Sequence, residues 1–216
     1  MKFFFSLFSL FISITFTAQT QKLTLEEIWS GEFRQSYLHS FNPMRGDFYS
    51  LLNYHRDSQS TSIDIYSYES LEKSKTIVDS KNLSEINFIE SYSFNNSETH
   101  ILLATNTEYI YRHSTQSVYY IYEVATKKLT KVIDKPIQEP TFSGDSKKIA
   151  FIQDNNIYVK SIESGEILQI TYDGKRNEII NGLTDWVYEE EFSFVKAYEW
   201  SSDNNKIAYL KFDESE

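Results

Sequence analysis

Residues 142–152, FSGDSKKIAFI, place an aromatic residue, a polar turn and an apolar run in immediate succession. Phe142 precedes Ile149 by seven residues, and the Ser-Gly-Asp segment between them consists of residues that favour turns. The run at 149–152 is short and rich in β-branched and aromatic side chains, as is typical of a buried strand. This stretch therefore predicts two strands joined by a tight turn.

The same order of residues recurs along the chain. The aromatic and apolar pairs are Phe41 and Phe48, Phe94 and Ile101, Phe142 and Ile149, and Trp200 and Ile207. Successive aromatic residues are separated by 53, 48 and 58 residues, and periods near 50 are typical of β-propeller blades. Each unit also contains further short strand-like runs, such as 117–124 and 129–132, so a four-stranded antiparallel blade is expected.

We therefore expect an all-β fold, a partial β-propeller of about three to four four-stranded antiparallel blades with a short N-terminal helix. Three units are nearly complete, and the fourth begins near Trp200. An immunoglobulin-like sandwich also has many short strands, but it does not predict the repeated order of aromatic residue, turn and strand. The helix is expected at 23–29, where Thr24 and Glu27 form a capping-box pattern.

The N-terminus has the features of a secretory signal peptide. Lys2 is followed by an apolar run at 3–16 and by small or polar residues at 17–20. We divide the chain into a signal peptide (1–19), a lead-in segment with the short helix (20–40) and the propeller portion (41–216). An uncleaved membrane anchor is the alternative, and the cleavage point stays open. Both interpretations predict an exported protein, whether periplasmic, secreted or at the cell surface.

Composition excludes several classes of function. The formal net charge of -10 argues against nucleic acid as a partner. There is no Cys, which excludes disulfides and zinc sites built on thiolates. The four His residues show no H-E-x-x-H spacing, so neither a metal site nor a cofactor is predicted.

Residues 181–192, NGLTDWVYEEEF, combine aromatic side chains with three consecutive carboxylates. One interpretation is a solvated acidic run at the start of a helix. The segment lies within the longest interval of the repeat, so it is expected to be an insertion between the third and fourth blades. Such projecting segments commonly carry functional residues.

The sequence DWVYEEE at 185–191 resembles the double-glutamate motif of the dipeptidyl peptidase IV family of serine exopeptidases. The resemblance implies an eight-bladed propeller, of which this chain would be the first half. It also implies that Glu190 and Glu191 bind the free α-ammonium group of a peptide substrate, whereas Glu189 is placed outside the pair. An α-amino group has a pKa of roughly 8, so near neutrality it can form charge-assisted hydrogen bonds to two carboxylates.

Arg112 lies in the segment YRHS at 111–114, between two strands of the second unit. It resembles the arginine of the same family that binds the carbonyl oxygen of the penultimate substrate residue. A guanidinium group can bind a carbonyl and also pair with a nearby carboxylate. The alternative is a loop arginine in a weak surface ion pair. We assign no role to His113.

The family resembled also has a hydrolase domain with a Ser-Asp-His triad, whose serine lies in a G-x-S-x-G elbow. The six glycines include no two that are four residues apart, so the elbow is missing and no catalytic residue is predicted here. Whether this chain is part of an enzyme is left open.

We expect the N-terminal propeller portion of a secreted dipeptidyl peptidase IV-like serine peptidase, which releases N-terminal dipeptides. Its expected partners are a peptide with a free N-terminus and a hydrolase domain in cis or on a separate chain, with a homodimer possible for the full-length protein. The alternative is a non-catalytic propeller fragment that binds peptides or proteins. The preferred substrate residues are not defined by this sequence.

Overall fold

The computed structural model describes residues 23–33, 38 and 40–215. The chain divides into two compact units, Met1–Tyr37 and Leu38–Glu216. The predicted signal peptide lies outside the described residues. In the first unit, helix α1 (Leu25–Ser30) begins after Thr24, whose hydroxyl accepts from the Glu27 amide while Glu27 accepts from the Thr24 amide. The predicted helix and its capping box are confirmed.

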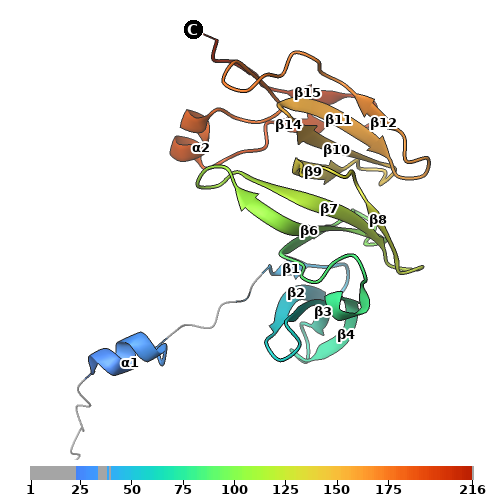
Figure 1. Ribbon diagram of the computed structural model, residues 1–216. Coiled ribbons are helices and arrows are strands. Elements are labelled where there is room, and N and C mark those ends of the chain that lie inside the picture. Colours follow the sequence, from blue (N-terminus) through green and yellow to red (C-terminus); the bar gives the residue numbers. More distant parts are fainter. Residues whose placement is uncertain (1–22, 34–37, 39, 216) are drawn as a thin grey trace, which may run out of the picture. The chain divides into compact units, whose positions relative to one another are not determined.

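The second unit consists mainly of antiparallel sheets that follow one another in chain order (Figure 1). The first sheet contains β1 (Asn42–Pro43), β2 (Phe48–His55), β3 (Ser60–Ser67) and β4 (Lys73–Asp79), followed by the 3-10 turn η1 (Ser80–Asn82). The second contains β5 (Ser91–Phe94), β6 (His100–Tyr109), β7 (Thr115–Glu123) and β8 (Lys128–Lys131). The third contains β9 (Gln138–Phe142), β10 (Lys148–Gln153), β11 (Asn156–Ser161) and β12 (Ile167–Gln169).

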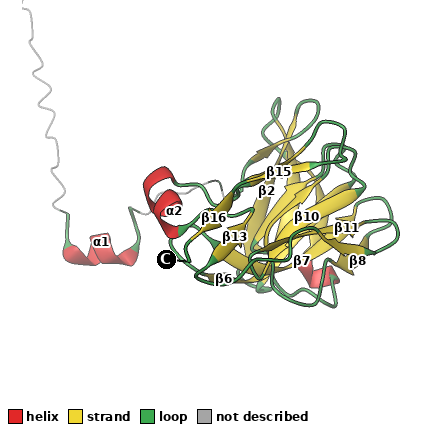
Figure 2. Cartoon of the chain, turned by 90° about the horizontal axis from the view of Figure 1, so that it is seen from above, coloured by secondary structure: helices red, strands yellow, loops and turns green. Residues whose placement is uncertain are grey.

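The fourth unit consists of two short pairs rather than one sheet. Its strands are β13 (Ile179–Asn181), β14 (Tyr198–Trp200), β15 (Ile207–Tyr209) and β16 (Lys211–Asp213). β13 pairs with β16 and β14 pairs with β15, both antiparallel. Strands predominate in the described part of Leu38–Glu216 (Figure 2), and the predicted all-β partial propeller is confirmed.

In the second and third sheets, the second strand is buried on both faces, because each face packs against a different neighbour. On β6, Ile101 and Leu103 belong to the hydrophobic cluster shared with the first sheet, whereas Leu102 belongs to the cluster shared with the third. β10 alternates in the same way between the second sheet and the fourth unit. Since side chains alternate along a strand, burial of both faces requires an uninterrupted apolar run. Each such side chain contributes about 1.5–3 kcal/mol on full burial.

The repeated turns share one hydrogen-bonding pattern. Side-chain oxygens of Asn95, Ser143 and Ser201 accept from the amide five residues later, at 3.0, 3.0 and 2.9 Å. In these repeats, the aromatic residue and the apolar residue seven positions later are Cα partners across the first two strands. The first repeat differs, because Pro43 pairs with Tyr49 there. The seven-residue spacing in these three repeats therefore reflects a turn with the same hydrogen bond in each.

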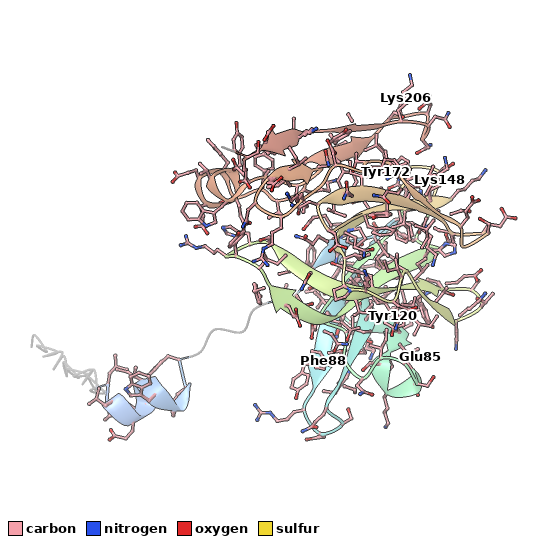
Figure 3. The ribbon with its side chains drawn as sticks, turned by 45° about the horizontal axis from the view of Figure 1, so that its top comes forward. Glu85, Phe88, Tyr120, Lys148, Tyr172 and Lys206 are labelled. Carbon is pink, nitrogen blue, oxygen red and sulfur yellow. The ribbon has the colours of Figure 1, made fainter. Side chains whose placement is uncertain are left out.

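Equivalent turns also contact one another from blade to blade. The Asn96 side chain donates to the Gly144 carbonyl at 3.4 Å, and the Lys148 ammonium donates to the Asn204 carbonyl at 3.2 Å. Figure 3 shows Lys148 and Lys206 toward the same end of neighbouring sheets. These polar contacts supplement the apolar packing between the sheets.

Asp64 of β3 is a buried charge at the centre of a polar network, with 1% of its surface exposed. Its carboxylate accepts from Asn53 at 2.8 Å, from Ser62 at 3.0 Å and from Thr76 at 2.6 Å, and pairs with Lys73 at 3.0 Å. Burial alone raises the pKa of Asp64, but these hydrogen bonds together outweigh it and hold the pKa below its ordinary value.

We expect Asp64→Asn to lower the free energy of unfolding by about 1–3 kcal/mol at neutral pH, because donors around the carboxylate lose their acceptor. The pKa of Asp64 is lowered by folding, so its stabilisation is present at neutral pH and is lost as the pH falls through the folded-state pKa. Urea unfolding of both proteins from neutral to acidic pH should show the difference shrinking with acidification. A difference that stays constant contradicts this assignment.

Candidate functional site

The acidic motif lies on helix α2 (Trp186–Phe192), at the tip of an insertion between β13 and β14. The insertion has a two-stranded neck, in which the Thr184 amide donates to the Val195 carbonyl at 3.0 Å and Leu183 bridges Lys196. The motif was expected between the third blade and the fourth, but β13 already pairs with β16, so the insertion lies within the fourth unit.

Gly182 forms the base of this neck and has a φ of +80°. A Cβ atom added there would lie 2.8 Å from Ile152 and 3.1 Å from Ile157, both in the core of the third sheet. The insertion therefore leaves the blade in direct contact with that core, which is possible only without a side chain at residue 182.

The helix is short and depends on its caps and its aromatic contacts. The Asp185 carboxylate accepts from the Tyr188 amide at 2.8 Å at its start, and Ser193 ends it with a φ of 56°. The ring of Tyr188 contacts three others, with centroids 5.1–5.9 Å away, from Phe192, Phe194 and Phe212.

Figure 1 shows α2 beside the turn that joins β6 and β7 of the second sheet. Glu189 makes this contact, with only 2% of its surface exposed. One of its oxygens, Oε1, accepts from the backbone amides of His113 at 2.7 Å and Ser114 at 2.8 Å. Burial alone raises the pKa of Glu189, but the hydrogen bonds from Ser114 and His113 hold it below its ordinary value.

Of the three predicted site residues, the structure brings two together. Arg112 Nη1 lies 3.2 Å from Glu190 Oε2. The Glu190 side chain is 16% exposed and the Arg112 side chain is 70% exposed. Glu191 is exposed on the same helix, and no other side chain in the described part of the chain pairs with it. The arrangement offers one paired carboxylate, one free carboxylate and a guanidinium group with unused donors.

A cavity of about 540 Å³ opens next to this arrangement, a volume that suits a small ligand. Its lining includes Tyr111 and Ser114 of the β6–β7 turn and Trp186 and Glu189 of α2. The three predicted residues are not among the described residues that line it, although their sequence neighbours are. The cavity and the acidic arrangement are therefore adjacent.

The structure also gives a position to residues for which no role was predicted. Glu189 was placed outside the ligand-binding pair, and the structure turns it toward the β6–β7 turn. His113 was given no role, yet its backbone amide binds Glu189. The sequence gives no signal for this contact, because the Ser114 amide that Glu189 binds lies 75 positions away in the chain.

Within residues 23–33, 38 and 40–215, no helix has the length and apolarity needed to cross a bilayer. The same residues contain no cluster of three or more His, Asp or Glu side chains arranged to hold a metal ion.

Comparison with known proteins adds independent information. A family model described as the dipeptidyl peptidase IV (DPP IV) N-terminal region matches residues 95–216. Prolyl endopeptidase FAP of Mus musculus is 31% identical over 197 residues, which is 90% of this chain and 25% of that protein. Dipeptidyl peptidase 4 of Bos taurus is 37% identical over 131 residues, covering 59% of this chain and 17% of that protein.

A solved structure agrees over nearly the whole chain. The crystal structure of Porphyromonas gingivalis dipeptidyl peptidase 4 has a TM-score of 0.80 and 34% sequence identity, and the match covers 90% of this chain and 28% of that one. The chain thus spans about a quarter of the length of the relatives that match most of it.

Gly182→Ala should lower the free energy of unfolding by about 1–3 kcal/mol more than Gly165→Ala does, because its methyl group overlaps Ile152. Gly165 is the matched control, since its φ is +74° and nothing lies within 4 Å of an added Cβ. Urea denaturation of the two variants measures the difference. Equal decreases in the free energy of unfolding would contradict close packing of residue 182 against Ile152.

Proposed function

The chain belongs to the dipeptidyl peptidase IV family, and we propose that it forms the N-terminal propeller portion of an exported peptidase that binds the free amino terminus of its peptide substrates. The observation that carries this proposal is the pairing of Arg112 with Glu190 at 3.2 Å, beside the exposed Glu191. The names of the relatives, dipeptidyl peptidase and prolyl endopeptidase, support peptide hydrolysis as the activity of the whole protein.

A substrate ammonium group supplies three donors and one positive charge, which two carboxylates can accept together. Glu190 is mostly buried, so its attraction for a cation is screened less than that of a fully exposed carboxylate. Glu191 is exposed and unpaired among the described residues, so it can bind a cation without first losing a partner. An internal peptide bond has no such charge, and the site therefore selects chain ends.

Arg112 can orient both Glu190 and the bound peptide. Its contact with Glu190 uses Nη1, which leaves other N–H groups for the carbonyl oxygen of a substrate residue. A planar guanidinium group fixes direction as well as distance. Together the three side chains would hold a peptide by its end and set its reading direction.

In this proposal the chain binds and positions the substrate, and the attacking serine belongs to a hydrolase domain outside residues 1–216. That domain would cleave after the second residue and release a dipeptide. The signal-peptide-like N-terminus supports export as the route of the protein to its substrates.

The test compares affinities for two fluorescent tetrapeptide pools, randomised at the first two positions and either free or acetylated at the N-terminus. We expect Glu190→Gln to lower the preference for the free pool by roughly 30-fold or more, because breaking a desolvated charge pair costs about 2–5 kcal/mol. Glu191→Gln should also lower the preference, but by less, because Glu191 is exposed and water screens its charge. Fluorescence anisotropy with the full-length gene product gives both affinities.

Glu163→Gln is the matched control, because it removes one exposed carboxylate far along the chain from α2. It should leave the preference unchanged. A preference that survives in both site variants would assign the acidic run to the solvated surface. Release of N-terminal dipeptides from the free pool distinguishes a peptidase from a module that only binds peptides.

A further inference from the structure

We infer that Glu189 is a positioning residue, whose buried carboxylate holds the β6–β7 turn against α2 and thereby sets the distance between Arg112 and Glu190. The inference rests on the proposed function, because it describes how that same site is assembled. It gives the three glutamates two different tasks: one binds protein backbone, and two face the ligand.

The geometry places Glu189 between the two halves of the ion pair. Its acceptor oxygen binds the amides of His113 and Ser114, which directly follow Arg112 in the chain. Glu189 itself directly precedes Glu190. A single side chain therefore fixes the backbone next to both partners of the ion pair, although the helix and the turn come from different blades.

The ion pair alone is too weak to fix this geometry. Arg112 is 70% exposed, and exposed pairs contribute about 0–1 kcal/mol. Hydrogen bonds to a charged acceptor are stronger, and Glu189 is 2% exposed, so its two bonds do not compete with water. Among the described residues, these two hydrogen bonds and the ion pair are the polar contacts between α2 and the turn.

The neck of the insertion does not by itself hold α2 against the second blade. At its base, the Gly182 amide donates to the Leu210 carbonyl of the fourth unit at 3.0 Å, and the Asn181 amide donates to the Asn155 carbonyl of the third sheet at 3.1 Å. These contacts do not include the second blade, which carries Arg112. Among the described residues, the polar contacts that link the helix to the second blade are those of Glu189 and Glu190.

The experiment uses the full-length gene product in three variants: Glu189→Ala, Glu189→Gln and Asn95→Ala. Asn95 is the matched control, since its Oδ1 also accepts two backbone amides, of Thr99 at 2.9 Å and His100 at 3.0 Å, and it is 3% exposed. It lies at the opposite end of β6 from the Arg112 turn. Loss of its bonds reports general destabilisation of the same blade.

Two quantities are measured: the preference for the free over the acetylated peptide pool, and hydrogen exchange of the amides at 110–116. We expect Glu189→Ala to lower the preference at least about tenfold and to accelerate exchange, because two charge-assisted bonds are lost. Glu189→Gln keeps an acceptor oxygen and should stay within about threefold of the wild type. Asn95→Ala should change neither the preference for the free pool nor the amide exchange at 110–116.

The inference is overturned if Glu189→Ala keeps the wild-type preference, or if Asn95→Ala reduces it as strongly. If the wild type itself does not distinguish the two pools, the proposed function is wrong, and exchange alone decides the role of Glu189. Faster exchange in Glu189→Ala but not in Glu189→Gln then supports the positioning role, and unchanged exchange excludes it.

Discussion

The blades are held together through β6 and β10, the second strands of the second and third sheets, which are buried on both faces. Each of these strands packs against two neighbouring units, so neither of the two sheets is complete without its neighbours. The same strand β6 continues to the turn that carries Arg112. A strand clamped on both faces gives that turn a fixed base, as a binding site requires of its scaffold.

The three glutamates of α2 show how one chemical group acquires different roles through burial. Adjacent carboxylates repel one another, and partners or exposure to water reduce that repulsion. Backbone amides do this for Glu189, and a guanidinium group does it for Glu190. Glu191 has no such partner among the described residues, and its charge is exposed to solvent.

Most of the fold could be predicted because its repeat combines two local rules, the apolar run and the five-residue turn bond. The first repeat departs in register, since β1 is only two residues long and contains Pro43, which has no amide to donate. The family resemblance indicated Arg112, Glu190 and Glu191, and the structure places the first two 3.2 Å apart. The position of Glu189 could not be predicted, because only the approach of a turn distant in sequence distinguishes it from its neighbours.

Binding of the cationic form of an amino terminus, as proposed for this site, would make peptide affinity depend on pH. A site for ammonium predicts constant affinity for the free pool up to about pH 7 and a fall approaching tenfold per pH unit above roughly pH 8, where the α-amino group loses its proton. The acetylated pool should bind weakly at every pH. The α-amino pKa of roughly 8 lies between pH 6 and pH 10. An affinity for the free pool that stays constant over about this range would contradict binding of the ammonium form.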